Sequence, residues 1–119
     1  MTLIIDLFDP VKGPYSYLDA IENDAAGFES YRHAVWGAVG SVYAKARFLP
    51  QLRDDDLWVY PQELEAFAEE CRQLHAVAPS LARALWGAPE GAESLRRYLD
   101  RFLAAIELAR ERGVGVCIS

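Results

Sequence analysis

The feature that most constrains the fold is a short apolar strand that runs directly into an amphipathic helix, residues 57–78. Residues 57–60 are too few for a helix, and three aspartates and Pro61 bound them. Proline is tolerated at the first helical position, where the backbone N–H has no intrahelical partner, so Pro61 predicts a helix start. Apolar residues then recur every three or four positions, which predicts one buried face: Leu64, Phe67, Ala68, Cys71, Leu74 and Ala78. The opposite face is expected to be exposed: Glu63, Glu65, Glu69, Glu70, Arg72 and Gln73.

Two further long helices are predicted on either side of this unit. Ser30 fits the N-cap of a helix over 31–48, although Gly37 and Gly40 each weaken it by about 1 kcal/mol relative to alanine. The other helix is expected over 92–112, because apolar residues recur there at helical spacing and Gly113 is a typical stop. Shorter helical turns are predicted at 15–21 and 80–86, a loop at 23–27, and Pro79 at the end of the second helix.

Strands are predicted at 2–8, 57–60 and 114–118. The first should place Leu3, Ile5 and Leu7 on one face of a sheet. A chain of 119 residues fits a single domain. We therefore expect an α+β fold, or a small open α/β fold, with three long helices packed mainly on one face of a small sheet of about three short strands.

Composition and charge narrow the classes of function. Hydrophobic residues make up 52% of the chain, yet no apolar run approaches the roughly 18 residues of a membrane span, and the first residues lack a basic region. A cytoplasmic protein that does not enter a membrane is expected. The net charge of −6 argues against a nucleic-acid partner, because lysine and arginine supply most of that affinity.

Few residues are candidates for catalysis, disulfide formation or metal binding. Cys71 and Cys117 are expected to be buried, reduced thiols, with a disulfide between them as the alternative. Cys71 and His75 share a helix face and could form a thiolate–imidazolium pair, but a cysteine packed beside a half-buried histidine is far commoner. Asp54, Asp55 and Asp56 could bind a hard cation, and a solvated turn is favoured instead. No enzyme, cofactor or metal is expected.

Acidity is concentrated in the first 30 residues, where six acids and one lysine give a charge of −5. Tyrosine among carboxylates is typical of a protein-binding surface, although these rings could equally cap the core from a loop. The outer face of the second helix, with Glu63, Glu65, Glu69 and Glu70, is the rival acidic patch. The residues predicted to bind a protein partner are Tyr15, Tyr17, Asp19, Glu22, Asp24 and Glu29.

A resemblance covers about two-thirds of the chain. The sequence resembles small bacterial proteins that are encoded beside polymorphic toxins as immunity proteins. It does so through Trp36, Phe48, Leu49 and Pro50, residues 56–60, Glu63 and Leu64, residues 69–71, 102–106 and 113–116. These positions are mostly structural and transfer no site residue. The resemblance implies a protein that binds and neutralises a cognate effector.

The leading hypothesis is therefore a non-enzymatic cytosolic inhibitor, an immunity protein that presents an acidic and aromatic surface to a basic toxin. Complementary charge would speed association and orient the two proteins. The alternative is a small structural or adaptor protein whose acidic face binds another basic protein. An enzyme that uses Cys71 and His75 is the third hypothesis.

Overall fold

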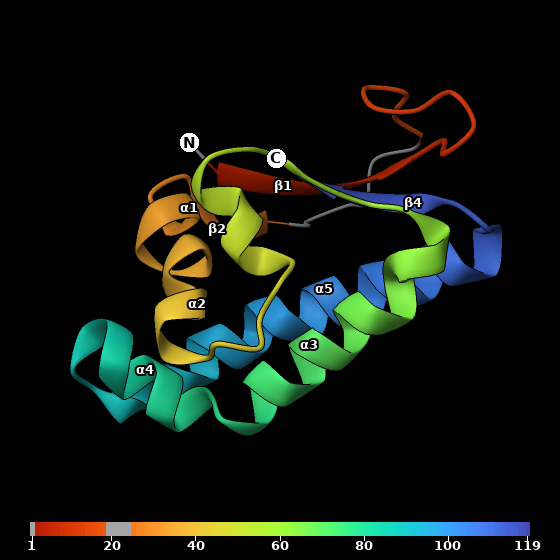
Figure 1. Ribbon diagram of the computed structural model, residues 1–119. Helices are drawn as coiled ribbons and strands as arrows, with labels where there is room; N and C mark the ends of the chain where they lie inside the picture. The colour runs from red at the N-terminus through yellow and green to blue at the C-terminus, as the bar shows by residue number, and fades with distance from the viewer. Residues whose placement is uncertain (1, 19–24) are drawn as a thin grey trace.

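The computed structural model describes residues 2–18 and 25–119, and these residues form an α+β fold. A curled, antiparallel sheet of four strands has the order β2-β1-β4-β3. Its strands are β1 (Thr2–Phe8), β2 (Ala25–Phe28), β3 (Leu57–Val59) and β4 (Gly115–Ile118). The longest helices, α3 (Leu64–Ala76) and α5 (Ala92–Arg112), lie side by side under one face of the sheet (Figure 1).

The predicted strands 2–8, 57–60 and 114–118 all form, and β2 is added to them. Strand β4 pairs with both β1 and β3, so that Ile118 lies opposite Ile5 on one side and Leu57 on the other. The prediction of a loop at 23–27 was wrong for its described part, because Ala25–Phe28 pairs antiparallel with β1. Alternation along β1 is as expected, with Leu3, Ile5 and Leu7 buried.

The strand–helix unit forms as its sequence predicts. Pro61 opens a 3-10 turn, η3 (Pro61–Glu63), that continues into α3, and the Glu63 carboxylate accepts a hydrogen bond from the Tyr60 backbone N–H at 3.2 Å. Helix α5 spans the predicted residues and ends at Gly113, whose φ of 68° needs the left-handed freedom of glycine. Between them lies α4 (Ala78–Trp86), followed by a 3-10 turn, η4 (Pro89–Gly91). Pro79 lies in the first turn of α4 and does not end α3, which stops at Ala76.

The single long helix predicted over 31–48 was wrong. The segment divides into α1 (Tyr31–Ala34), a 3-10 turn η1 (Trp36–Ala38), α2 (Val39–Val42) and an irregular stretch with a turn, which leads to a 3-10 turn η2 (Leu49–Arg53). A Cβ at Gly37 would lie 2.2 Å from the Arg32 carbonyl oxygen and 2.8 Å from Cβ of Arg53. The glycine therefore lets η1 and η2 approach closely, and tertiary packing outweighs the helical pattern.

One apolar core joins the sheet to the helices. Phe67 and Phe102 are fully buried, and their ring centroids lie 6.1 Å apart. Trp36 packs against Phe102 at 5.2 Å and donates its indole N–H to the Ala26 carbonyl at 2.6 Å, so its polar group is satisfied. The same cluster contains Leu64, Leu99 and Ile106.

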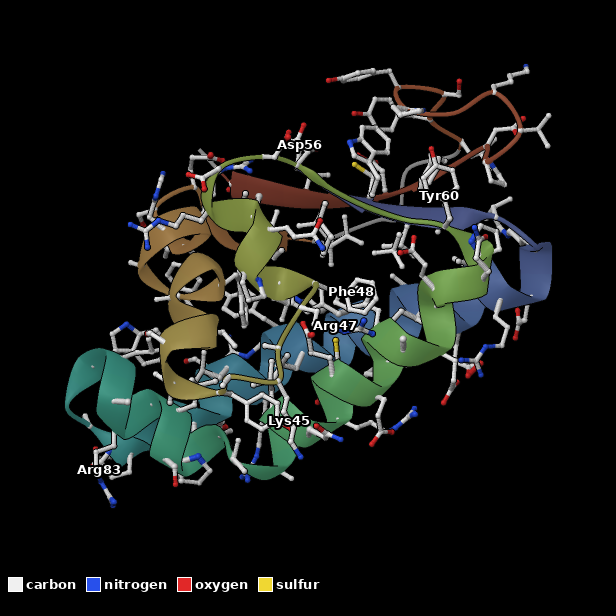
Figure 2. All side chains as sticks on the ribbon, in the orientation of Figure 1. Lys45, Arg47, Phe48, Asp56, Tyr60 and Arg83 are labelled. Atoms are coloured by element: carbon white, nitrogen blue, oxygen red, sulfur yellow. The ribbon has the colours of Figure 1, made fainter. Side chains whose placement is uncertain are left out.

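Glu70 is the one polar residue buried among the described residues, at 6% exposure, so its predicted place on the outer face of α3 was wrong. Its carboxylate accepts backbone N–H groups from three consecutive residues: Arg47, Phe48 and Leu49. Figure 2 shows Phe48 between the sheet and α3, where its ring lies 5.4 Å from that of Phe67. Glu70 therefore caps η2 and fixes the chain that crosses from α2 to β3.

Candidate functional site

The face of the sheet turned away from the helices carries an unusual set of side chains. Antiparallel pairing places Asp6 beside Cys117 and Cys117 beside Trp58, so these residues form one row across three strands. The next row along β1 holds Phe8 and Gly115. Side chains alternate between the two faces of a strand, so the two rows project from the outer side. Figure 2 places Asp56 and Tyr60, at the two ends of β3, on this side.

Because Gly115 has no side chain, an aromatic ring can pack directly against the backbone of the sheet at this position. A Cβ at Gly115 would lie 2.3 Å from the Phe8 ring and 2.7 Å from the Val59 carbonyl oxygen, so no side chain fits there. The Phe8 ring occupies this space and makes edge contacts with Trp58 and Tyr60, both at 5.1 Å. Phe8 is fully buried although it lies outside the main core. Phe8 is thus a fully buried residue of a second, smaller apolar layer on the outer face of the sheet.

The strap, which we define as residues 9–18, returns along the end of β1 and covers this layer. The backbone N–H of Leu18 donates to the Leu7 carbonyl at 2.9 Å, and Tyr17 forms an antiparallel bridge with Phe8. Asp9 shapes the turn, because its carboxylate accepts the Val11 N–H at 2.9 Å. Figure 1 shows the strap rising from the end of β1 on the side opposite the helices. The helical turn predicted at 15–21 was wrong for its described part, residues 15–18.

Two tyrosines of the strap lie on Trp58. The Tyr17 ring stacks on it at 5.8 Å and 28°, and the Tyr15 ring meets it edge-on at 5.3 Å. Tyr15 remains 72% exposed and Tyr17 45%. The φ of Tyr15 is +70°, a left-handed conformation that is costly for a residue with a Cβ and that concentrates at functional positions. We call Phe8, Tyr15, Tyr17, Trp58 and Tyr60 the aromatic face.

Burial changes the acid–base properties of the groups under the strap. Desolvation raises the pKa of Asp6 above its ordinary value. It also raises the pKa of Tyr17, with further contributions from its electrostatic interactions with Cys117, Asp56 and Asp6. Desolvation is likewise the largest cause that raises the pKa of Cys117 to about 12. Asp6 and Asp56 are therefore the two carboxylates of this cluster that interact electrostatically with Tyr17.

Arg32 connects the two edge strands at one end of the sheet. Its guanidinium pairs with Glu29 at 2.8 Å, just after β2, and with Asp56 at 3.2 Å, just before β3. It also donates to the backbone carbonyls of Leu52 and Asp55. Glu29, one of the residues predicted to bind a partner, is thus an ion-pair partner inside this chain and stays 47% exposed.

The structure brings together only part of the predicted set. Tyr15 and Tyr17 lie together on Trp58, whereas Glu29 belongs to the Arg32 cluster. Asp19, Glu22 and Asp24 lie outside the described residues. Sequence reasoning missed two residues of the surface, Asp6 and Trp58. The signal was present in both strands, since each residue alternates with buried apolar neighbours and therefore faces outward.

The rival acidic patch on α3 is largely neutralised by groups of the same chain. Glu65 pairs with Arg72 at 2.7 Å and with Arg110 at 2.6 Å, and Glu69 pairs with Arg72 at 3.0 Å. Hydrogen bonds to Arg72 lower the pKa of Glu65 below its ordinary value. Since Glu63 and Glu70 bind backbone N–H groups, all four glutamates have partners within the chain.

Cys71 and His75 have different surroundings in the structure. Cys71 is fully buried, and desolvation raises its pKa well above the ordinary value, so it is a thiol at neutral pH. His75 Nε2 instead lies 3.1 Å from the Asp100 carboxylate. In the part of the chain that the structure describes, no group of three His, Cys, Asp or Glu side chains could hold a metal ion. Within the same residues, no helix is both long and apolar enough to cross a membrane.

Both cysteines are free and buried, as expected, and this gives a testable consequence. We expect a small disulfide reagent at pH 7.5 to leave both thiols of the native protein unmodified over minutes, because neither Cys71 nor Cys117 is accessible or ionised. Adding denaturant should release two reactive thiols per chain. One thiol that reacts rapidly in the native protein would contradict this and would revive a nucleophilic role.

Comparisons with models of protein families, with curated proteins and with solved structures find no match for this chain. The chemistry of its own surface is therefore the basis for assigning a function.

Proposed function

We propose that this protein is a non-enzymatic immunity protein that acts in the cytoplasm and neutralises a basic bacterial toxin through its aromatic face. The observation that carries the proposal is an exposed pair of tyrosines held on Trp58, in the same strand row as Asp6, which has no ion-pair partner among the described residues. Tyrosine and tryptophan are enriched at the energetic centres of protein interfaces, because they bury a large area with little loss of conformational entropy. The alternative is an adaptor that binds another basic protein through the same face.

Charge favours a basic protein as the partner. The chain carries −6 overall, and −5 of that lies in its first 30 residues, which include the strap. Residues 19–24, which follow the strap, contain three acids and no basic residue. Nucleases are basic because their substrate is a polyanion, so an acidic inhibitor suits them. The glutamates of α3 have less unpaired negative charge for a basic partner, since arginines of the chain already pair with two of them.

A genetic experiment tests the proposal directly. The product of the gene next to this one is expressed in a bacterial host, with and without this protein, and growth is measured. We expect the neighbouring product to stop growth alone and this protein to restore it. A neighbouring product that binds this protein without being toxic would favour the adaptor. A toxic product whose effect this protein does not relieve would contradict an immunity function.

Two matched variants locate the interface. Glu22→Gln with Asp24→Asn removes two charges next to the strap, and Glu65→Gln with Glu69→Gln removes two from α3. We expect the first variant to slow association with the toxin and weaken its salt dependence, because exposed carboxylates mainly steer encounter. The second should associate at the native rate. The reverse result would move the interface to α3.

A third variant tests the aromatic contribution. Tyr15→Ala removes an exposed ring that packs on Trp58. We expect dissociation to become faster by about thirtyfold, equivalent to about 2 kcal/mol, because an aromatic anchor acts mainly on the lifetime of a complex. An unchanged dissociation rate would remove Tyr15 from the interface.

A further inference from the structure

The outer face of the sheet holds a half-buried carboxylate, that of Asp6, in the same strand row as Trp58. Among the described residues, no hydrogen-bond or ion-pair partner contacts Asp6, although Arg32, Arg72 and Arg110 each pair with acids elsewhere. Residues 19–24 contain no lysine, arginine or histidine, so they supply no cation either. A half-buried carboxylate without a counter-ion is unfavourable, because burial removes water that would stabilise its charge.

The surroundings of Asp6 are those that recognise a cation. Asp6 is opposite Cys117, and the next residue in that row is Trp58, on which Tyr17 stacks. The ring faces of tyrosine and tryptophan carry partial negative charge and attract ammonium and guanidinium groups. Asp56, whose carboxylate also pairs with Arg32 at 3.2 Å, adds a second carboxylate near Tyr17. Carboxylate and ring faces therefore present the same sign of charge to an incoming group.

We propose that Asp6, together with the Tyr17 and Trp58 rings, is the subsite that receives an arginine or lysine side chain of the partner. This inference rests on the proposed function and adds the chemistry of the contact. A guanidinium can bond a carboxylate through two N–H groups and stack on a ring at the same time, so arginine suits the subsite better than lysine.

The cost of Asp6 to folding supports a role in binding. Its pKa in the folded protein is raised above the unfolded value, so its charge destabilises the fold at pH values above the folded pKa, and this penalty disappears as the pH falls below the unfolded value. Asp6→Asn should therefore leave the unfolding midpoint at pH 7 unchanged or raise it. A residue that lowers stability and has no hydrogen-bond or ion-pair partner among the described residues is typical of a functional site.

The test uses a tripeptide of acetylated Gly-Arg-Gly as the probe, followed by NMR of the Asp6 carboxyl carbon and the Trp58 indole N–H. We expect both signals to shift in a saturable manner with the arginine peptide and to stay unmoved with its citrulline analogue, which has the same shape without the charge. Asp6→Asn should weaken binding by tenfold or more, because a hydrogen bond between charged groups is lost. Asp100→Asn, at an exposed acid of α5 whose carboxylate lies 3.1 Å from His75, is the control.

A pH series provides a second readout. The cation pairs with the ionised carboxylate only, so affinity should fall as the pH is lowered through the pKa of Asp6, which lies above that of an ordinary aspartate. The other titratable groups that face it are Tyr17 from the strap, Cys117 from β4 and Asp56 before β3. The tyrosine and the cysteine stay protonated over this range. Shifts spread evenly over many surface acids, or native affinity in Asp6→Asn, would overturn the subsite.

The two proposals fail in different ways. If Asp6→Asn still binds and neutralises the toxin with native affinity, the subsite is wrong and the immunity function stands. If the arginine peptide saturates Asp6 but the neighbouring product is harmless, the subsite stands and the immunity function is wrong.

Discussion

Phe102→Ala is expected to lower the free energy of unfolding by about 3–5 kcal/mol, a large part of the 5–15 kcal/mol typical of a domain. Phe102 is fully buried and lies between Trp36, at 5.2 Å, and Phe67, at 6.1 Å. Its ring thus links the η1 turn to the α3–α5 pair, and three parts of the core cannot all close on the space it leaves. The measurement is equilibrium unfolding in urea, followed by tryptophan fluorescence.

Phe28→Ala is the matched control for this variant. The Phe28 ring is 62% exposed and makes an edge contact with Tyr31 at 5.8 Å. Its removal should cost less than about 1 kcal/mol, because little apolar area leaves water on folding at that position. Equal losses for the two variants would mean that Phe102 does not occupy the centre of the core.

Glu70→Gln is expected to cost about 2–4 kcal/mol of stability although it preserves the shape of the side chain. The carboxylate accepts the Phe48 N–H at 3.0 Å and the Leu49 N–H at 2.9 Å, and it also binds the Arg47 N–H. An amide offers one acceptor oxygen and turns an N–H₂ donor toward backbone donors. At least one buried N–H then loses its partner, and a buried donor without an acceptor is costly.

Glu69→Gln, one residue earlier on the same helix, is the control. Its carboxylate pairs with Arg72 at the surface, where both side chains are about half exposed. Exposed ion pairs contribute little, so this variant should keep an unfolding midpoint close to that of the native protein. Chemical unfolding at pH 7 measures both variants. A native midpoint for Glu70→Gln would show that the 47–49 segment is held by packing alone.

The strand–helix unit and the C-terminal helix could be predicted because local signals agree with the final environment. Pro61 opens the turn into α3, the apolar spacing of α3 matches its buried face, and Gly113 ends α5 in the left-handed conformation. The alternation of β1 likewise placed Leu3, Ile5 and Leu7 in the core. In each case the periodicity of one element decides which side meets the core, and the rest of the chain does not change that choice.

Contacts between segments that are distant in the sequence decided the parts of the fold that local patterns did not predict. The apolar pattern over 31–48 is compatible with a helix, but the close approach at Gly37 and the capping of residues 47–49 by Glu70 favour turns. In the sequence, Glu70 cannot be distinguished from an exposed glutamate. Its burial depends on backbone donors that lie more than 20 residues away in the same chain. Local spacing carries no information about such a partner.

The candidate site also depends partly on local sequence and partly on contacts between distant segments. The sequence by itself determined that tyrosines and acids gather near the N-terminus and that Asp6 and Trp58 point away from the buried side chains of their strands. Only the tertiary structure placed Tyr17 on Trp58 and Asp6 in the row that ends at this ring, because three strands must pair and the strap must fold back before these residues meet. Pairing register is a long-range property, so the surface exists only in the folded sheet.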